Sequence, residues 1–89
     1  MQITVTGQQI DVGDALRTHI EDAIADTTEK YFADAIEATV VLSRESFRIR
    51  ATISMHVGRG IHVRAHEEAD DAYAAFDAAL AHFAKRLRE

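Results

Sequence analysis

The sequence of 89 residues contains no cysteine, no proline and no tryptophan, and it has only four glycines. Without cysteine the chain can form neither disulfides nor thiolate metal sites, which is typical of proteins in a reducing cytosol. No apolar run is long enough to span a membrane, and the opening MQITVT has the pattern of a strand, not of a signal peptide. We therefore expect a cytoplasmic protein that has no membrane partner.

Basic residues are also few, since ten Lys and Arg stand against fifteen Asp and Glu and give a net charge of −5. An overall excess of acid disfavours nucleic-acid binding unless the bases gather on one surface. The chain also lacks repeats, low-complexity tracts and linkers, while 47% of it is hydrophobic. This composition predicts one globular domain over residues 1–89.

The stretch 69–89 has the clearest helical pattern. Its large apolar residues recur at intervals of three and four and predict one buried stripe: Tyr73, Phe76, Leu80, Phe83 and Leu87. Both ends carry charges that suit the helix macrodipole, with acids first (Glu67, Glu68, Asp70, Asp71) and bases last (Lys85, Arg86, Arg88). We read Tyr73 and Phe76 as core residues and not as platforms for bases.

A second amphipathic helix is predicted over 11–32, capped by Asp11, Gly13 or Asp14. Its predicted buried stripe is Leu16, Ile20, Ile24, Thr27 and Tyr31. Its outer face is mostly acidic and carries Glu21, Asp22, Asp26 and Glu29. We expect these acids to be solvated.

Four segments alternate between apolar and polar residues and therefore predict strands. They are 1–6, 38–44, 47–57 and 61–66, and Gly58 and Gly60 supply the last turn because glycine adopts positive φ at little cost. The order β-α-β-β-β-α predicts an α+β fold with two layers. The sheet should be four-stranded and mixed, with its first two strands parallel and both helices packed on one face.

The other face of that sheet should be open to solvent. Alternation assigns to it three arginines, three histidines, several hydroxyls and no acid: Thr4, Thr6, Thr39, Val41, Ser43, Arg48, Arg50, Thr52, Ser54, His56, His62, Arg64 and His66. Such a surface suits phosphate and sugar oxygens, although it is also compatible with an ordinary polar sheet face. Arg59 in the turn and the bases Lys85, Arg86 and Arg88 could extend it.

The histidines do not predict a metal site, and no cofactor is expected. His62 and His66 lie on one strand about 13 Å apart, which is too far for a shared zinc ion. His56 and His62 are expected to face each other across the hairpin, and their titration would make the face more cationic at lower pH. No phosphate-binding glycine loop, serine elbow or cysteine nucleophile is present, so the sequence does not predict an enzyme.

The segment Asp71-Ala72-Tyr73-Ala74-Ala75-Phe76-Asp77 resembles the D-x-Y-A-A-hydrophobic-D segment of ribosome hibernation factors. This is the family of the ribosome-associated inhibitor and the hibernation-promoting factor. The resemblance extends over nearly the whole chain, including residues 1–7, 15–17, 31–32, 38–42 and 60–63. It implies the same β-α-β-β-β-α fold, which is similar to that of double-stranded-RNA-binding domains.

The resemblance implies that the chain binds the small ribosomal subunit and inhibits translation in stationary phase or stress. Family members contact ribosomal RNA in the messenger channel, over the A and P sites. By position, Lys85, Arg86 and Arg88 match the basic end of the family's last helix, and Arg17 matches a basic position in the first. The arginines Arg48, Arg50, Arg59 and Arg64 are added from alternation and from the turn.

Two departures from the family pattern stand out. Asp22, Asp26 and Glu29 occupy a surface that is usually rich in lysine, and the chain stops at Glu89 where the family has a basic tail. We therefore expect an N-terminal domain or a shortened chain. Long members of the family dimerise through a C-terminal domain, and we expect such a domain to lie outside residues 1–89.

Two other classes of function remain open from the residues. One is a small protein-interaction module that docks a partner protein through the sheet face or an edge strand. The other is a small pocket-bearing enzyme, which the lack of a nucleophile or acid-base pair disfavours, and no small-molecule substrate is expected. RNA binding should weaken steeply with salt, whereas strand addition should weaken much less.

Overall fold

The computed structural model describes residues 2–31, 35–58 and 60–87. Several predictions lie outside the described residues: those for Arg59 and Arg88, for the side chains of Tyr31 and Leu87, and for the segment ends Met1, Phe32 and Glu89.

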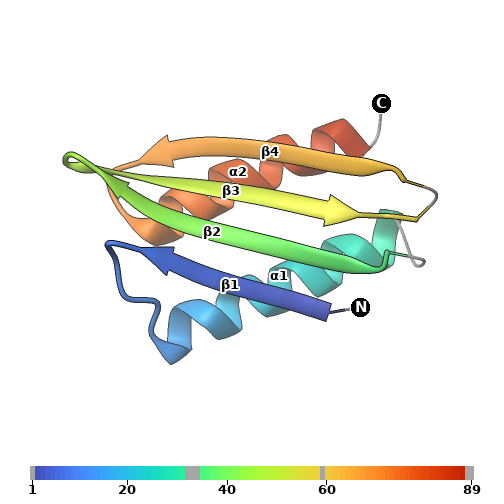
Figure 1. Cartoon of the computed structure of the whole chain (residues 1–89), viewed down its shortest axis with the longest axis horizontal. Helices are drawn as coiled ribbons and strands as arrows, with labels where there is room; N and C mark the ends of the chain where they lie inside the picture. The colour runs from blue at the N-terminus through green and yellow to red at the C-terminus, as the bar shows by residue number, and fades with distance from the viewer. Residues whose placement is uncertain (1, 32–34, 59, 88–89) are drawn as a thin grey trace.

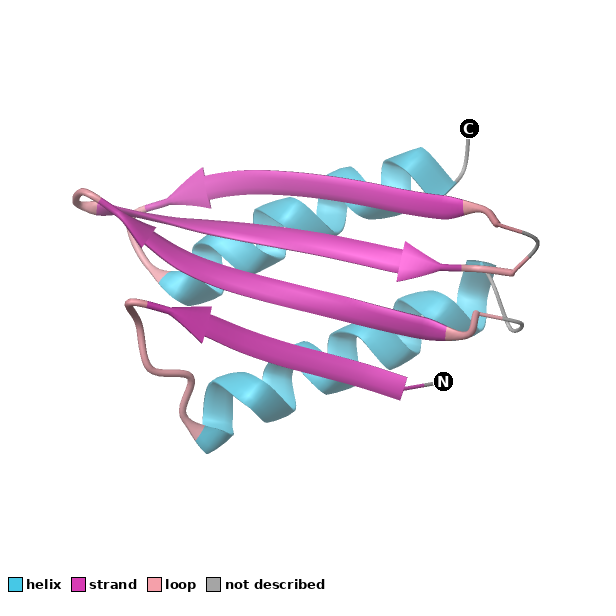
Figure 2. Cartoon of the chain, viewed as in Figure 1, coloured by secondary structure: helices cyan, strands magenta, loops and turns pink. Residues whose placement is uncertain are grey.

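The predicted order of elements is confirmed (Figure 1). The elements are β1 (Gln2–Gln8), α1 (Asp14–Tyr31), β2 (Glu37–Glu45), β3 (Arg48–His56), β4 (His62–Ala69) and α2 (Ala72–Leu87). The strands lie in the order β1-β2-β3-β4, with β1 parallel to β2 and the other pairs antiparallel. Both helices lie behind the sheet as it is viewed in Figure 2, so one layer is helical and the other face of the sheet is open.

The core lies between the sheet and the helices. Every second residue of the central strands points into it, and Val40, Leu42 and Ile53 are fully buried there. From the helices, the predicted residues Phe76 and Phe83 are also fully buried. Burying this apolar surface is the main term that stabilises a domain of this size.

The buried stripe of α2 differs from the prediction at Tyr73, whose surface is 44% exposed. The inward arc of this helix is centred on Phe76 and Phe83, and small alanines at 75 and 79 fill the space beside them. Tyr73 therefore lies at the edge of the arc, where its ring is 5.2 Å from that of His19 on α1. The prediction that Tyr73 is a core residue was wrong.

The stripe of α1 is confirmed at Leu16, Ile20 and Ile24, but the next buried position is Thr28 and not Thr27. Steps of four keep residues 16, 20, 24 and 28 over the sheet. The Thr28 hydroxyl can be buried because it donates to the carbonyl of Ile24 at 2.7 Å.

Phe47 was predicted to point into the core, and this was wrong, since it is 78% exposed. Glu45 pairs with Arg48 in the register, so only Ser46 and Phe47 are left to form the turn between β2 and β3. A two-residue hairpin turn requires positive φ, and Ser46 supplies it with a φ of 62°. Phe47 is therefore the second residue of the turn, and its side chain is exposed to solvent.

The fourth strand is longer than predicted. Ladder pairing with β3 continues through Arg50–Glu68 to Ile49–Ala69, so Glu67 and Glu68 belong to β4 and not to the start of the last helix. The helix begins after Asp71, whose carboxylate accepts a hydrogen bond from the Ala74 N–H at 2.8 Å. Asp71 is therefore the N-cap, as the acid-first pattern suggested.

Candidate nucleic-acid interface

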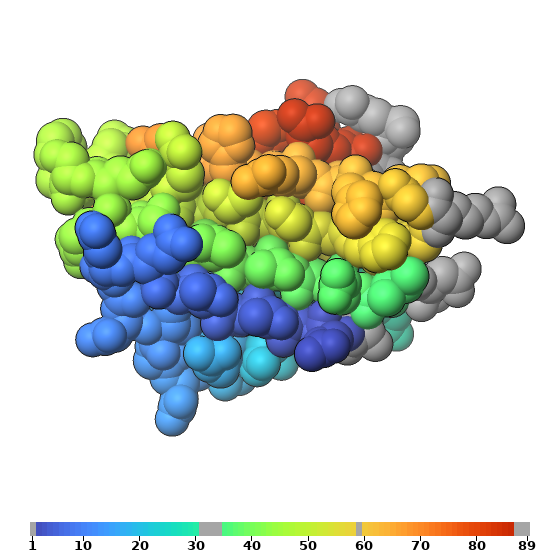
Figure 3. Space-filling view, in the orientation of Figure 1, coloured from blue at the N-terminus to red at the C-terminus, as the bar shows by residue number. Residues whose placement is uncertain are grey.

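The open sheet face is the surface on which alternation placed most of the candidate residues. The strand register confirms that all thirteen predicted residues share this face, because they occupy successive cross-strand rows. One row joins Thr4, Thr39, Ser54 and Arg64, and the next joins Thr6, Val41, Thr52 and His66. Figure 3 views the molecule from this side, with the side chains of the four strands in parallel bands.

The prediction that this face lacks acids was wrong. Glu37, Glu45 and Glu68 have the same strand parity as the arginines, and Glu45 and Glu68 bind them directly. The alternating pattern left Glu45 between the predicted strands 38–44 and 47–57, and Glu68 was assigned to the start of the last helix. Glutamate is uncommon in strands, and two acids before a helix suit its dipole. Ladder pairing with β3 overrides both preferences.

Two glutamates and two arginines form an ionic cluster at one end of the face: Glu45, Arg48, Arg50 and Glu68. Arg50 lies between both carboxylates, with Nη2 2.9 Å from Glu68 Oε2 and Nε 3.0 Å from Glu45 Oε2. Arg48 Nε lies 3.8 Å from Glu68 Oε1, and its Nη2 donates to the Glu68 carbonyl at 3.3 Å. The four charges cancel within the cluster.

Arg50 and Glu68 each stabilise the charged form of the other. The hydrogen bond from Arg50 lowers the pKa of Glu68 below its ordinary value, and the charges of Arg50, Arg48 and His66 act in the same direction. The hydrogen bond to Glu68, followed by the charge of Glu45, raises the pKa of Arg50. The arginines predicted to meet phosphate at this end are thus already engaged by carboxylates.

The middle of the face is slightly hollow, and most of the side chains that line it are uncharged. A depression of about 340 Å³ is lined by Gln8, Val41, Ser43, Glu45, Arg50, Thr52, Ser54 and Arg64. Arg64, which lies on β4, is exposed and lines this depression. Its side chain forms no ion pair or hydrogen bond with any of the described residues. Hydroxyls beside an available guanidinium form a surface that can donate hydrogen bonds to sugar and phosphate oxygens.

His56 and His62 lie at the end of the face opposite the ionic cluster, whereas His66 lies in the row beside Glu68. His56 and His62 are partners in the register, and their rings stack with centroids 4.4 Å apart and an angle of 15° between planes. The prediction that they face each other across the hairpin is confirmed. Gly58 and Gly60 hold that hairpin with φ values of 90° and 75°, as predicted for the turn.

The helix residues predicted to bind RNA are not gathered with the sheet face. Arg17 is half-buried near the start of α1, and its Nη1 donates to the Val5 carbonyl at 3.5 Å. Lys85 and Arg86 are exposed in the last turn of α2. Figure 1 shows these two helix ends at opposite ends of the molecule, so the candidates form separate groups.

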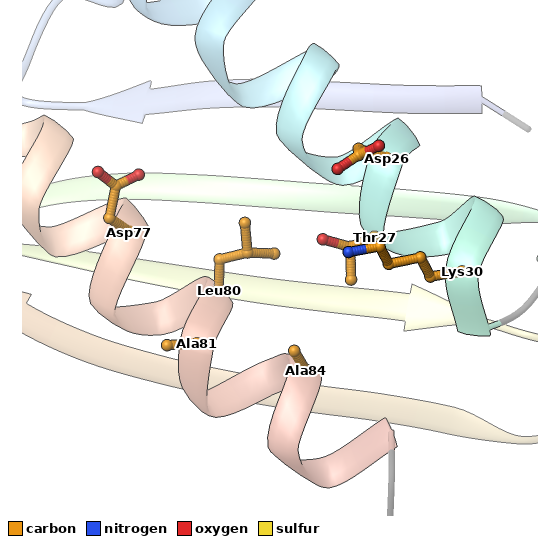
Figure 4. Close-up of a pocket in the computed structure, with 7 residues that line it drawn as sticks. All are labelled: Asp26, Thr27, Lys30, Asp77, Leu80, Ala81 and Ala84. Atoms are coloured by element: carbon orange, nitrogen blue, oxygen red, sulfur yellow. The ribbon is translucent and has the colours of Figure 1, made fainter.

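A groove of about 380 Å³ lies between the two helices on the other side of the molecule (Figure 4). Leu80, Ala81 and Ala84 of α2 face Thr27 of α1 there, and the charged lining residues are Asp26, Lys30 and Asp77. Asp77 also accepts a hydrogen bond from His19 Nε2, at 2.8 Å when that nitrogen carries the proton. Two acids against one base make this groove a poor place for phosphate.

The described part of the chain contains no group of three or more His, Asp or Glu side chains that could hold a metal ion. Within the same residues, neither helix is long and apolar enough to cross a membrane.

Comparison with known proteins gives consistent matches over this fold. A family model described as "Sigma 54 modulation protein / S30EA ribosomal protein" matches residues 3–89. The chain is 34% identical over 88 residues to the ribosome hibernation promotion factor of Bradyrhizobium diazoefficiens, covering 99% of this chain and 43% of that relative. It is 35% identical over 77 residues to the ribosome hibernation promoting factor of Azotobacter vinelandii, covering 86% of this chain and 70% of that one.

A solved structure described as the N-terminal domain of Thermus thermophilus Protein Y superposes with a TM-score of 0.83 and 31% identity. The match covers 99% of this chain and 97% of that domain, and the predicted two-layer fold is confirmed by it. The chain spans less than half the length of the Bradyrhizobium relative and of a second rhizobial relative.

Proposed function

This chain belongs to the Sigma 54 modulation protein / S30EA ribosomal protein family, and from that premise we propose that it is a ribosome hibernation factor. It binds the small ribosomal subunit through ribosomal RNA near the A and P sites and the messenger channel, and it inhibits translation during stationary phase or stress. It works in the cytoplasm and has no catalytic role. The observation that carries the proposal is the family match over residues 3–89, together with relatives named as hibernation factors.

The mechanism is steric occupancy. A protein lodged where messenger and transfer RNA bind prevents initiation without any chemical step, and phosphate contacts from Arg and Lys hold it there. The structure supplies two exposed groups of bases for such contacts, Arg64 on the sheet face and Lys85 with Arg86 at the end of α2. Arg48 and Arg50 join them only where RNA competes with Glu45 and Glu68.

Pairing of ribosomes would require more than this domain. The family resemblance implies that long members dimerise through a C-terminal domain, and residues 1–89 correspond to less than half of the rhizobial relatives. We assign to this domain the binding of the subunit and not the pairing.

One observation favours the second candidate, a protein-interaction module. Ile61 is 53% exposed immediately before β4, which is an edge strand of the sheet. An edge strand beside an exposed apolar side chain can receive an extended peptide by strand addition. Such binding depends on backbone hydrogen bonds and apolar contact, so salt affects it little.

Co-sedimentation with isolated small ribosomal subunits, at low and at physiological salt, tests the proposal. Saturable binding that falls with salt and is displaced by messenger and transfer RNA would support it. Binding that is indifferent to salt would favour the protein-interaction module. No binding at low salt would refute the proposed function for this chain.

A further inference from the structure

Resting on the proposed function, we infer that RNA binding to the sheet face is linked to protonation of a histidine-rich row along β4. The row consists of His62, Arg64 and His66, with His56 of β3 stacked on His62. Its ligand is the phosphodiester backbone of RNA, and its affinity rises as pH falls through the range in which histidine titrates.

The geometry of the row follows from the strand. His62, Arg64 and His66 are alternate residues of β4, so their side chains point to the same face at intervals of about 6.6 Å. All three are exposed. Separate phosphates along a strand of RNA can therefore each meet one of these side chains.

The charged residues around the row determine whether the sheet face is neutral or cationic. Glu37 lies opposite His56 in the register, Glu68 follows His66 on the same face, and Arg64 stands between the two histidines of β4. Glu68 is engaged by Arg48 and Arg50, and Glu45 by Arg50, so that cluster adds no net charge. Arg64 and Glu37 then cancel when the histidines are neutral, and the face is cationic only when they are protonated.

The stacked pair couples proton uptake to anion binding. Two imidazolium rings whose centroids are 4.4 Å apart repel each other. A phosphate beside the pair relieves that repulsion. The linkage is reciprocal. If bound RNA favours protonation of the histidines, protonation of the histidines raises the affinity for RNA by the same factor.

The test compares binding of the chain to isolated small ribosomal subunits between about pH 8 and pH 6, the range in which histidine charge changes. We expect affinity to rise at least about tenfold for the wild-type chain, since two or three added charges each contribute roughly a factor of three to five in a screened setting. The salt dependence should steepen by about one power or more at the lower pH.

Three variants make the result specific. His56→Gln/His62→Gln/His66→Gln should lose the rise in affinity between about pH 8 and pH 6. Arg64→Gln should bind more weakly at every pH and keep the rise. His82→Gln is the matched control, since His82 lies on α2 with Nδ1 3.0 Å from Glu67 Oε2 on the other face of β4, and it should keep the rise.

The outcomes separate the two ideas. Saturable binding that does not change with pH, or a rise that is as large in the triple variant as in the wild type, would overturn the proton linkage and leave the proposed function standing. Absence of binding at every pH and salt concentration would overturn the proposed function, and the linkage with it. Because the subunit is the same in every arm, any titration of the subunit itself appears equally with the triple variant and is subtracted.

Discussion

The ionic cluster on the sheet face allows a gain of affinity to be predicted from two substitutions. Glu45 and Glu68 hold Arg50 at 3.0 and 2.9 Å, and Glu68 also contacts Arg48, so both guanidiniums are engaged within the protein. Glu45→Gln/Glu68→Gln removes both negative charges and keeps the shape of the side chains. The two arginines then become available to phosphate.

The size of the effect follows from counterion release. Each new phosphate contact should steepen the dependence of log K on log salt by about 0.7 to 0.9. Two contacts therefore add roughly 1.4 to 1.8 powers, so the gain over the wild type should be about tenfold larger at fourfold lower salt. Co-sedimentation with small ribosomal subunits over a salt series measures both the affinity and the slope.

The matched control changes the same net charge on the helix layer. Asp22→Asn/Glu29→Gln also removes two exposed negative charges, but both residues lie on α1, which packs behind the sheet. Equal gains from the two double variants would show that only net charge matters, and the argument for the cluster would be refuted. No gain from the first variant would show that Arg48 and Arg50 do not meet RNA.

Three further predictions concern the fold. Phe76→Ala should lower the free energy of unfolding by about 3 to 5 kcal/mol because the ring is fully buried, whereas Phe47→Ala should change it by less than about 0.5 kcal/mol, as measured by urea unfolding. Asp71→Ala removes the N-cap of α2 and should cost about 1 kcal/mol, with the exposed neighbour Asp70→Ala as the control in thermal melts. The lowered pKa of Glu68 means that its contribution to stability is present above the unfolded value, near 4.3, and is lost as pH falls through the folded value. Unfolding measured from neutral to acid pH should show this loss in the wild type, and Glu68→Gln should lack that component.

The sequence was sufficient for the architecture because periodicity depends on burial. Alternation in 38–44 and 47–57 and the four-residue steps from Leu16 to Ile24 each reflect one buried face, and the structure has those faces where they were predicted. The errors lie where local patterns end. Phe47 continues an alternating run into a two-residue turn, and Tyr73 continues a helical stripe beyond the arc that the sheet covers.

The candidate site was predicted less completely because it depends on register. Alternation placed Arg48, Arg50 and Arg64 on one face, but it could not show that β4 pairs with β3 as far as Ala69. That extension brings Glu68 beside Arg50 and changes the face from uniformly basic to basic only along β4. Two acids before a helix can belong either to the first turn of the helix or to the end of the preceding strand. Only the ladder between β4 and β3 shows that Glu67 and Glu68 belong to the strand.

The net charge of −5 is compatible with a local RNA contact because of distance and screening. Five of the fifteen acids lie on α1, on the far side of a molecule whose shortest extent is 20 Å. At physiological ionic strength the Debye length is about 8 Å, so charges on the helix layer are largely screened from a ligand on the sheet face. At about 0.01 M salt the Debye length grows to about 30 Å and exceeds that extent, and the acids of α1 then oppose the approach of RNA. The helix-layer control should therefore gain affinity mainly at the lowest salt, whereas the cluster variant should gain it wherever RNA binds at all.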